Sequence, residues 1–327
     1  MTVVTLGLIA AGAICILVAV GLMVFSAYVA RRVDQALPAQ GKFVDIGADR
    51  IHYIDRGNGP PIVFIHGLSG QLRNFAYLPL QELEQTNRVI VLDRPGSGNS
   101  TRGAGSSAGI AAQAQTIARF IEALGLHKPV IVGHSLGGAI ALAIGLNHPR
   151  SVGRLALIAP LTHMMAPPRV FAQLVIASSW VRAIVSVTLA VPLGIRHGPA
   201  ALKAVFAPEV APKDFAMKGG GLLGLRPRGF RTASSDLVAV NDDLPSLERR
   251  YAALRMPVDV LYGRGDEILD WRHHGEALTH KVSHAALHLV DGGHMLPITQ
   301  PAITIEWLRT LVAVPTAQAS PTATTSA

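Results

Sequence analysis

One serine of the chain stands in a segment whose composition suits nucleophilic catalysis. Ser135 lies within Gly133-His134-Ser135-Leu136-Gly137, which fits the pattern G-x-S-x-G and follows an apolar run at 129–132. This pattern is typical of a sharp turn between a strand and a helix that exposes the serine hydroxyl. The glycines remove side chains where the two backbones approach each other. We therefore expect Ser135 to be a nucleophile.

A serine hydroxyl becomes a good nucleophile only beside a base that a third group orients. His294 lies in a glycine-rich loop after the apolar run 285–290, and Asp266 follows another such run at 258–261. Both runs predict strands, so both side chains should project from strand ends. The order along the chain is serine, aspartate, histidine, which differs from the chymotrypsin-like order. Ser135, Asp266 and His294 are thus the predicted triad.

An oxyanion that forms near Ser135 would need hydrogen-bond donors. The segment 61–65 predicts a buried strand that ends in His66-Gly67-Leu68-Ser69-Gly70. We expect the backbone N–H of Leu68 to be one donor and that of Leu136, at the start of the next helix, to be the other. A fifth block, 93–100, follows a strand-like run and predicts a tight glycine turn.

These five blocks, in this order, resemble the α/β-hydrolase fold superfamily, in its esterase, lipase and haloperoxidase-like branch. The resemblance covers roughly residues 42–314. It implies an α/β fold with a mostly parallel central sheet flanked by helices. It also implies a cofactor-free serine hydrolase that cleaves a carboxylic ester through an acyl-enzyme, with Ser135 as nucleophile, His294 as base and then acid, and Asp266 as the orienting carboxylate.

Proteins that resemble this fold also have other activities. Haloalkane dehalogenases and epoxide hydrolases of this fold carry an aspartate where Ser135 stands, and proline iminopeptidases typically carry a tryptophan where Leu136 stands. A thioester, an amide or a carbon–carbon bond would use the same machinery as an ester. A ligand receptor or accessory protein that keeps the triad without turnover is the alternative from another class, since a fold alone does not give a function.

A metal site is not expected. The spacing His280-x-x-x-His284-x-x-x-His288 would suit zinc on a helix. The run 285–290 reads as a strand, however, and no carboxylate nearby completes a ligand set.

The N-terminus predicts a membrane helix. Residues 2–30 contain no charged side chain, and a span needs about 20 apolar residues. No basic residue precedes the apolar run and no clean A-x-A site follows it, which favours an uncleaved anchor over a signal peptide. Arg31 and Arg32 come directly after the run, so the positive-inside bias places the catalytic part on the cytoplasmic face.

The composition agrees with a membrane-bound enzyme. The mean hydropathy is +0.36 and the formal net charge is +8. The basic residues are scattered without a basic run or an aromatic platform, so we expect membrane lipid rather than nucleic acid as the partner of this charge. The substrate is expected to be a lipophilic ester. The only cysteine, Cys15, lies within the predicted anchor and forms no intramolecular disulfide.

The predicted organisation has five parts. An anchor at 1–32 precedes a first core segment at 40–160, a helical lid at 161–250, a second core segment at 251–314 and a disordered tail at 315–327. The lid is expected because the insertion is too long for a simple crossover. Its first part is apolar, but a second span there would separate Ser135 from the other two triad members. This first part is therefore either a re-entrant or surface-lying helix that touches lipid or a hydrophobic roof packed on the core. Residues 219–221 and 225–231 are expected at the hinge or rim of the lid.

Overall fold

The computed structural model describes residues 3–313 and is built around one sheet of eight strands. The central strands are continuous apolar runs, because both of their faces are covered. The strands are β1 Lys42–Ile46, β2 Asp49–Arg56, β3 Pro61–Ile65, β4 Arg88–Leu92, β5 Val130–His134, β6 Arg154–Ile158, β7 Val258–Gly263 and β8 Ala285–Val290.

The strand order is β1-β2-β4-β3-β5-β6-β7-β8. The first two pairings, β1 with β2 and β2 with β4, are antiparallel, and all the others are parallel. The carboxyl ends of β3 to β8 therefore meet at one edge of the sheet. Ligands of open parallel sheets bind at such an edge, so this is where a site should lie.

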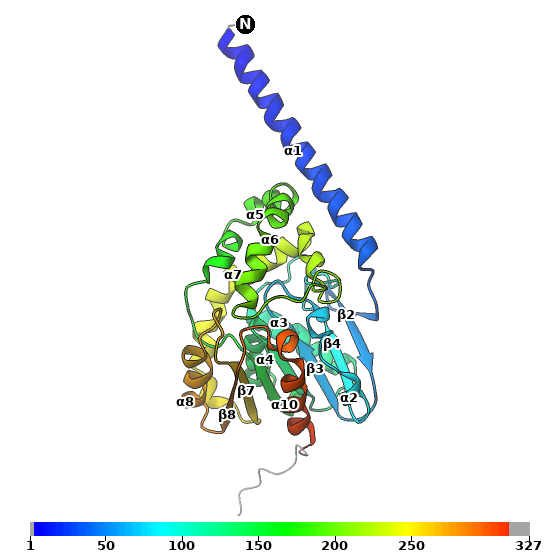
Figure 1. Cartoon of the computed structure of the whole chain (residues 1–327), viewed down its shortest axis with the longest axis vertical. Helices are drawn as coiled ribbons and strands as arrows, with labels where there is room; N and C mark the ends of the chain where they lie inside the picture. The colour runs from blue at the N-terminus through cyan, green and yellow to red at the C-terminus, as the bar shows by residue number, and fades with distance from the viewer. Residues whose placement is uncertain (1–2, 314–327) are drawn as a thin grey trace, which may run out of the picture.

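Helices cover both faces of the sheet (Figure 1). One buried cluster joins the sheet to α3 and α4, and a second joins its other face to α10. The helices are α1 Val3–Ala36, α2 Gln81–Glu84, α3 Ile110–Ala123, α4 Leu136–Asn147, α5 Ser179–Val187, α6 Ala190–Phe206, α7 Pro227–Glu248, α8 Ala277–Lys281, α9 Leu296–Thr299 and α10 Pro301–Ala313.

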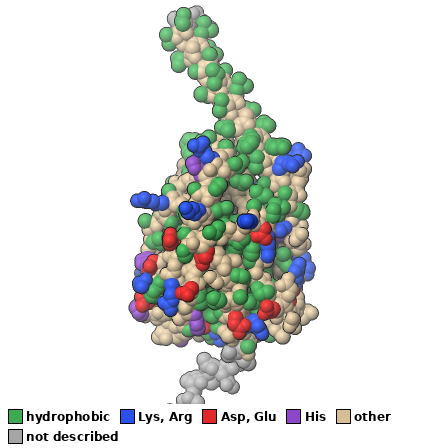
Figure 2. All heavy atoms as spheres, viewed as in Figure 1, with side chains coloured by type: hydrophobic (Ala, Val, Ile, Leu, Met, Phe, Trp, Pro, Cys, Tyr) green, Lys and Arg blue, Asp and Glu red, His purple; other side chains and the backbone are tan. Residues whose placement is uncertain are grey.

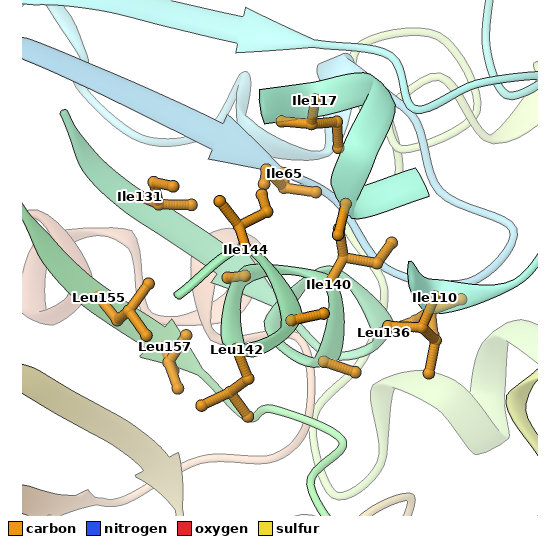
Figure 3. Packing of buried hydrophobic residues seen from close by; sticks show 14 of the residues in the cluster. Ile65, Ile110, Ile117, Ile131, Leu136, Ile140, Leu142, Ile144, Leu155 and Leu157 are labelled. Atoms are coloured by element: carbon orange, nitrogen blue, oxygen red, sulfur yellow. The ribbon is translucent and has the colours of Figure 1, made fainter. Parts of the chain in front are cut away.

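The helix α4 lies at the centre of the larger core. Its residues from Leu136 to Gly145 are all buried, and it carries no charged side chain. A helix that is apolar on every side belongs inside a protein. Figure 3 shows its side chains between the neighbouring strands and α3: Leu136, Ile140, Leu142 and Ile144 pack among Ile65, Ile117, Ile131, Leu155 and Leu157. This packing fixes the turn that precedes α4.

A helical insertion separates β6 from β7 and contains α5, α6 and α7. It lies at the end of the molecule from which α1 projects (Figure 1). The predicted fold class is confirmed: a mostly parallel sheet with flanking helices, a helical insertion and a long apolar N-terminal helix. The predicted boundaries of the five parts stay predictions, and the tail at 315–327 lies outside the described residues.

Candidate active site

Ser135 occupies a strained turn between β5 and α4. Its φ is 54° and its ψ is −120°, in a region that non-glycine residues rarely adopt. A Cβ on Gly133 would touch the Gly137 carbonyl, and one on Gly137 would touch that of Ile65. Glycine is therefore required at both positions, as the sequence predicted. Such strain costs about 1–3 kcal/mol and collects at functional sites.

His294 and Asp266 form a buried pair at the carboxyl ends of the last two strands. The Nδ1 of His294 lies 2.8 Å from the Oδ2 of Asp266. The other oxygen, Oδ1, accepts hydrogen bonds from the backbone N–H groups of Ile268 and Leu269, each at 2.8 Å. Because one oxygen is held by the backbone, the second is fixed in direction. The carboxylate can thus orient the imidazole and leave Nε2 available as a base.

His134, the residue before Ser135, contacts His294 of this pair. The Nε2 of His134 lies 3.0 Å from the carbonyl oxygen of His294, and the centres of the two rings are 5.0 Å apart. Burial lowers the pKa of His134 to about 3. This ring is therefore neutral at pH 7 and places no positive charge beside the His294 ring. Within the described residues, no hydrogen bond joins the Ser135 hydroxyl to the His294 ring.

The two predicted oxyanion donors lie on the same cavity as the serine. Leu68, Ser135 and Leu136 all line it. Leu136 is the first residue of α4, where backbone N–H groups lack partners inside the helix. Among the described residues, neither the Leu68 N–H nor the Leu136 N–H donates a hydrogen bond. Both donors are free to bind an anionic oxygen.

The loop that carries Leu68 is held by a buried arginine that the sequence analysis did not identify. The guanidinium of Arg94 donates to the carbonyls of His66 and Gly67, each at 3.0 Å, and its backbone N–H donates to His66 Nε2. Arg94 also pairs with Asp236 of α7 at 2.8 Å, and both side chains are fully buried. The helical insertion thus helps to fix the loop that carries Leu68. Burial lowers the pKa of His66 to about 3, so it serves this network as a neutral acceptor.

A second contact links the insertion to the histidine loop. Both carboxylate oxygens of Glu209 lie 3.0 Å from the backbone nitrogen of Gly293, the residue before His294. Phe206, at the end of α6, is fully buried against Phe215 and Met295. Sequence reasoning had no local signal for Glu209, because its partner is 84 residues away.

The cavity beside Ser135 is apolar and measures about 60 Å³. Asn241 is the one lining residue, besides the serine, with a polar side chain. The full lining is Leu68, Ser135, Leu136, Leu161, Met165, Pro167, Pro168, Phe171, Leu237, Val240, Asn241, Leu244, Ile268 and Leu269. Residues of the helical insertion supply much of this wall, which therefore suits an apolar chain rather than a charged group.

The other sequence candidates lie away from this cavity. Residues 219–221 and 225–231 sit at the start of η4 (Gly221–Leu225) and along the first turns of α7. The carbonyl of Gly219 accepts from Gln71 and Asn74, so this segment is tied to the core. His280 lies on α8 and His288 on β8, so the three spaced histidines do not follow one helix.

Comparison with known proteins identifies relatives of the same fold. The family described as alpha/beta hydrolase fold matches residues 60–186, which include the serine turn. A dihydrolipoyllysine-residue acetyltransferase component of the acetoin cleaving system of Cupriavidus necator is 35% identical over 39% of this chain and 34% of its own length. Haloalkane dehalogenase 2 of Mycobacterium tuberculosis is 28% identical over 57% of this chain and 66% of its own length. The chain thus spans about a third of the first relative and two thirds of the second.

A solved structure extends the likeness over most of the chain. The structure of a putative lipase from Acinetobacter baumannii AYE has a TM-score of 0.65 and 21% identity, and the match covers 90% of this chain and 97% of that one. At this identity the likeness concerns the fold, which both chains share almost end to end.

Proposed function

We propose that this chain, which has the α/β-hydrolase fold and matches that family over residues 60–186, is a serine hydrolase that cleaves a carboxylic ester. Ser135 is the nucleophile, His294 the base and acid, and Asp266 the orienting carboxylate. The observation that carries the proposal is the 2.8 Å bond between His294 and Asp266 at the sheet edge where Ser135 stands on its strained turn. The serine argues against dehalogenation, because that reaction on this fold uses an aspartate at this position.

In the proposed mechanism, Ser135 Oγ attacks the ester carbonyl carbon while His294 Nε2 accepts the hydroxyl proton. The Leu68 and Leu136 N–H groups bind the resulting oxyanion. When the intermediate collapses, the bond to the leaving oxygen breaks and His294 gives its proton to the alcohol. Water, deprotonated by the same ring, then attacks the acyl-enzyme and releases the acid. The contact from serine to histidine is expected to tighten when substrate binds, because such contacts are often loose in empty sites.

A lipophilic acyl group is the substrate feature that the cavity favours. Its wall is formed almost entirely by aliphatic, methionine, proline and phenylalanine side chains. Each buried methylene contributes about 0.8 kcal/mol to binding. We therefore infer that turnover improves as the acyl chain lengthens, until the cavity is full.

We further propose that α1 is an uncleaved membrane anchor with the catalytic part on the cytoplasmic side. The helix is 34 residues long, is apolar enough to cross a membrane, and has no buried residue in its most apolar stretch. The later part of the same helix packs on the catalytic part: the Ser26 hydroxyl donates to the Thr188 carbonyl, and Val33 is buried against Leu223. A segment destined for removal would not contribute to the core in this way.

The test is covalent labelling together with turnover. A fluorophosphonate probe is expected to label the full-length protein in detergent but not Ser135→Ala, and Ser135→Ala should lower kcat on the best ester by about a millionfold. The control is Ser246→Ala, an exposed serine on α7, which should label and turn over normally. Esters from acetyl to palmitoyl form the panel. Near-normal turnover by Ser135→Ala would refute the assignment, and labelling without turnover of any ester would favour a ligand-binding role.

A further inference from the structure

The helix α1 consists of two parts with different surroundings. Its only buried residues are Ser26 and Val33, so the part before residue 26 contains no buried side chain. From Ser26 onward the helix is docked: the Ser26 hydroxyl donates to the Thr188 carbonyl at 3.4 Å, and Val33 packs against Leu223. Asp34 forms an ion pair with Arg226 at 2.9 Å. The catalytic part is therefore fixed against the helix and does not hang from a loose linker.

The first part of α1, residues 3–25, has the length of a membrane span. At 1.5 Å per residue, residues 3–25 measure about 34 Å, and the hydrocarbon layer of a bilayer is about 30 Å thick. The first charged residues, Arg31 and Arg32, follow within two turns and reach the headgroup layer. If residues 3–25 span the membrane, the surface of the hydrocarbon layer passes close to Ser26. Thr188, bonded to Ser26, then lies at the same depth.

Thr188 stands between α5 and α6, which meet at an angle of 79°. On the outer face of this pair, apolar side chains are strongly exposed: Trp180 at 69%, Ile184 at 54%, Leu189 at 45% and Leu193 at 42%. Trp180 and Ile184 are four residues apart on α5, and Leu189 and Leu193 are four residues apart at the start of α6, so each pair shares one face of its helix. Figure 2 shows apolar side chains continuing from α1 onto the adjoining end of the body.

The polarity of α5 is inverted relative to that of a helix in water. Its charged residue, Arg182, points inward and donates to Ser234 and to the Ile176 carbonyl, while Trp180 and Ile184 point outward. A surface helix normally turns its charged side chains to the solvent and its apolar ones to the core. This arrangement is stable where the outer surroundings are apolar.

The charges around this outer face match a bilayer that contains anionic lipid. The segment 179–206 contains no Asp or Glu, whereas Arg196 and Lys203 are exposed without an ion pair among the described residues. Arg31 and Arg32 add two more exposed cations at the end of α1. Basic residues near the surface of an anionic leaflet are attracted to it.

We propose that the outer face of α5 and α6, formed by Trp180, Ile184, Leu189 and Leu193, lies in the interfacial layer of the bilayer that α1 spans, and that acyl chains pass from this layer to Ser135. The segment η3 (Arg169–Leu174) connects the two regions, because only four residues separate it from α5 and its Phe171 lines the cavity beside Ser135. The delivery step rests on the proposed hydrolase function, whereas the contact with the membrane does not.

The contact is tested by attaching a fluorophore to a single cysteine. In a Cys15→Ser background, Trp180→Cys carries the fluorophore at the proposed face, and Glu306→Cys carries it on α10, at the far end of the molecule (Figure 1). Both full-length proteins are placed in vesicles with and without anionic lipid and with acyl chains brominated near the headgroup. The label at position 180 should be quenched severalfold more than that at 306. Equal quenching at the two positions would overturn the proposal.

Delivery is tested with two substrates. Replacing both Trp180 and Ile184 by Glu should lower turnover of a long-chain ester embedded in vesicles by about tenfold, and leave turnover of a soluble acetyl ester unchanged. Trp180→Leu is the matched control and should retain turnover of both. An equal loss on the two esters would refute delivery by this face. If wild-type protein cleaves neither ester, the hydrolase proposal fails, and the quenching result still decides whether the face contacts lipid.

Discussion

Four buried histidines make the stability of this protein sensitive to acid. Burial is the main cause of a lowered pKa at each of them: about 3 for His66, His134 and His274, and about 4 for His163. In the unfolded chain these histidines bind protons near pH 6.5, whereas in the folded chain they bind them only at lower pH. The free energy of unfolding is therefore highest above pH 6.5 and falls as the pH drops from there toward 4.

His163 offers a direct test, because its Nε2 is buried without a hydrogen-bond partner. We predict that His163→Phe weakens the dependence of stability on pH between 6.5 and 4.5 by up to about 1.4 kcal/mol per pH unit, the contribution of one proton. The ring contact with Tyr251 should survive the change, so stability at pH 8 should stay close to that of wild type. Thermal unfolding at several pH values measures this. The exposed His127→Gln is the control, and an unchanged slope in His163→Phe would contradict the assignment.

Among single residues, the sequence predicted the ones whose role depends on neighbours that are close along the chain. The glycines that the Ser135 turn requires lie within a five-residue segment around the serine, so the sequence itself contains the whole pattern. The bond between His294 and Asp266 was predicted from strand ends and order, and the structure brings these two side chains together. The assignment of the three residues as a triad stays a prediction. Arg94 was seen as part of a turn, but its ion pair with Asp236, 142 residues away, leaves no local pattern.

Among the elements, α7 is attached to the core through a buried charge. Asp236 accepts from Arg94 at 2.8 Å and from Arg102 at 2.6 Å, and it has no exposed side-chain surface. We predict that Asp236→Asn lowers the free energy of unfolding by about 3–5 kcal/mol, because it leaves buried arginines without a counter-charge. Denaturant unfolding measures the loss. The exposed pair of Arg309 and Glu306 provides the control, since Glu306→Gln should cost less than about 1 kcal/mol.

The same contact predicts an effect on activity. Arg94 holds the carbonyls of His66 and Gly67, which lead into the oxyanion loop. Asp236→Asn should therefore lower kcat under conditions where the variant is still folded, with a smaller change in KM. A variant that is less stable but fully active would show that α7 supports the core without positioning Leu68.

The sequence predicted that a helical insertion is present but not which faces of its helices are turned inward. The existence of the insertion followed from the length between two strand-like runs, and helices α5 to α7 are present there. The apolar character of its first part left open whether it is a roof over the core or a surface for lipid. The direction of Arg182 favours the second answer, and that direction depends on packing against Ser234 of α7. Hydropathy alone does not report which face of a short helix is turned inward.

For the whole molecule, the docking of α1 connects membrane topology to activity. We predict that the full-length protein stays in the membrane after carbonate washing with α1 intact, and that its catalytic part faces the cytoplasm. In a Cys15→Ser background, Glu122→Cys on α3 is exposed and should react with a membrane-impermeant maleimide only after cell lysis. Val3→Cys, at the other end of α1, is exposed and should react in intact cells. The reverse pattern would place the active site outside, and a mature protein whose mass lacks α1 would identify a cleaved signal instead.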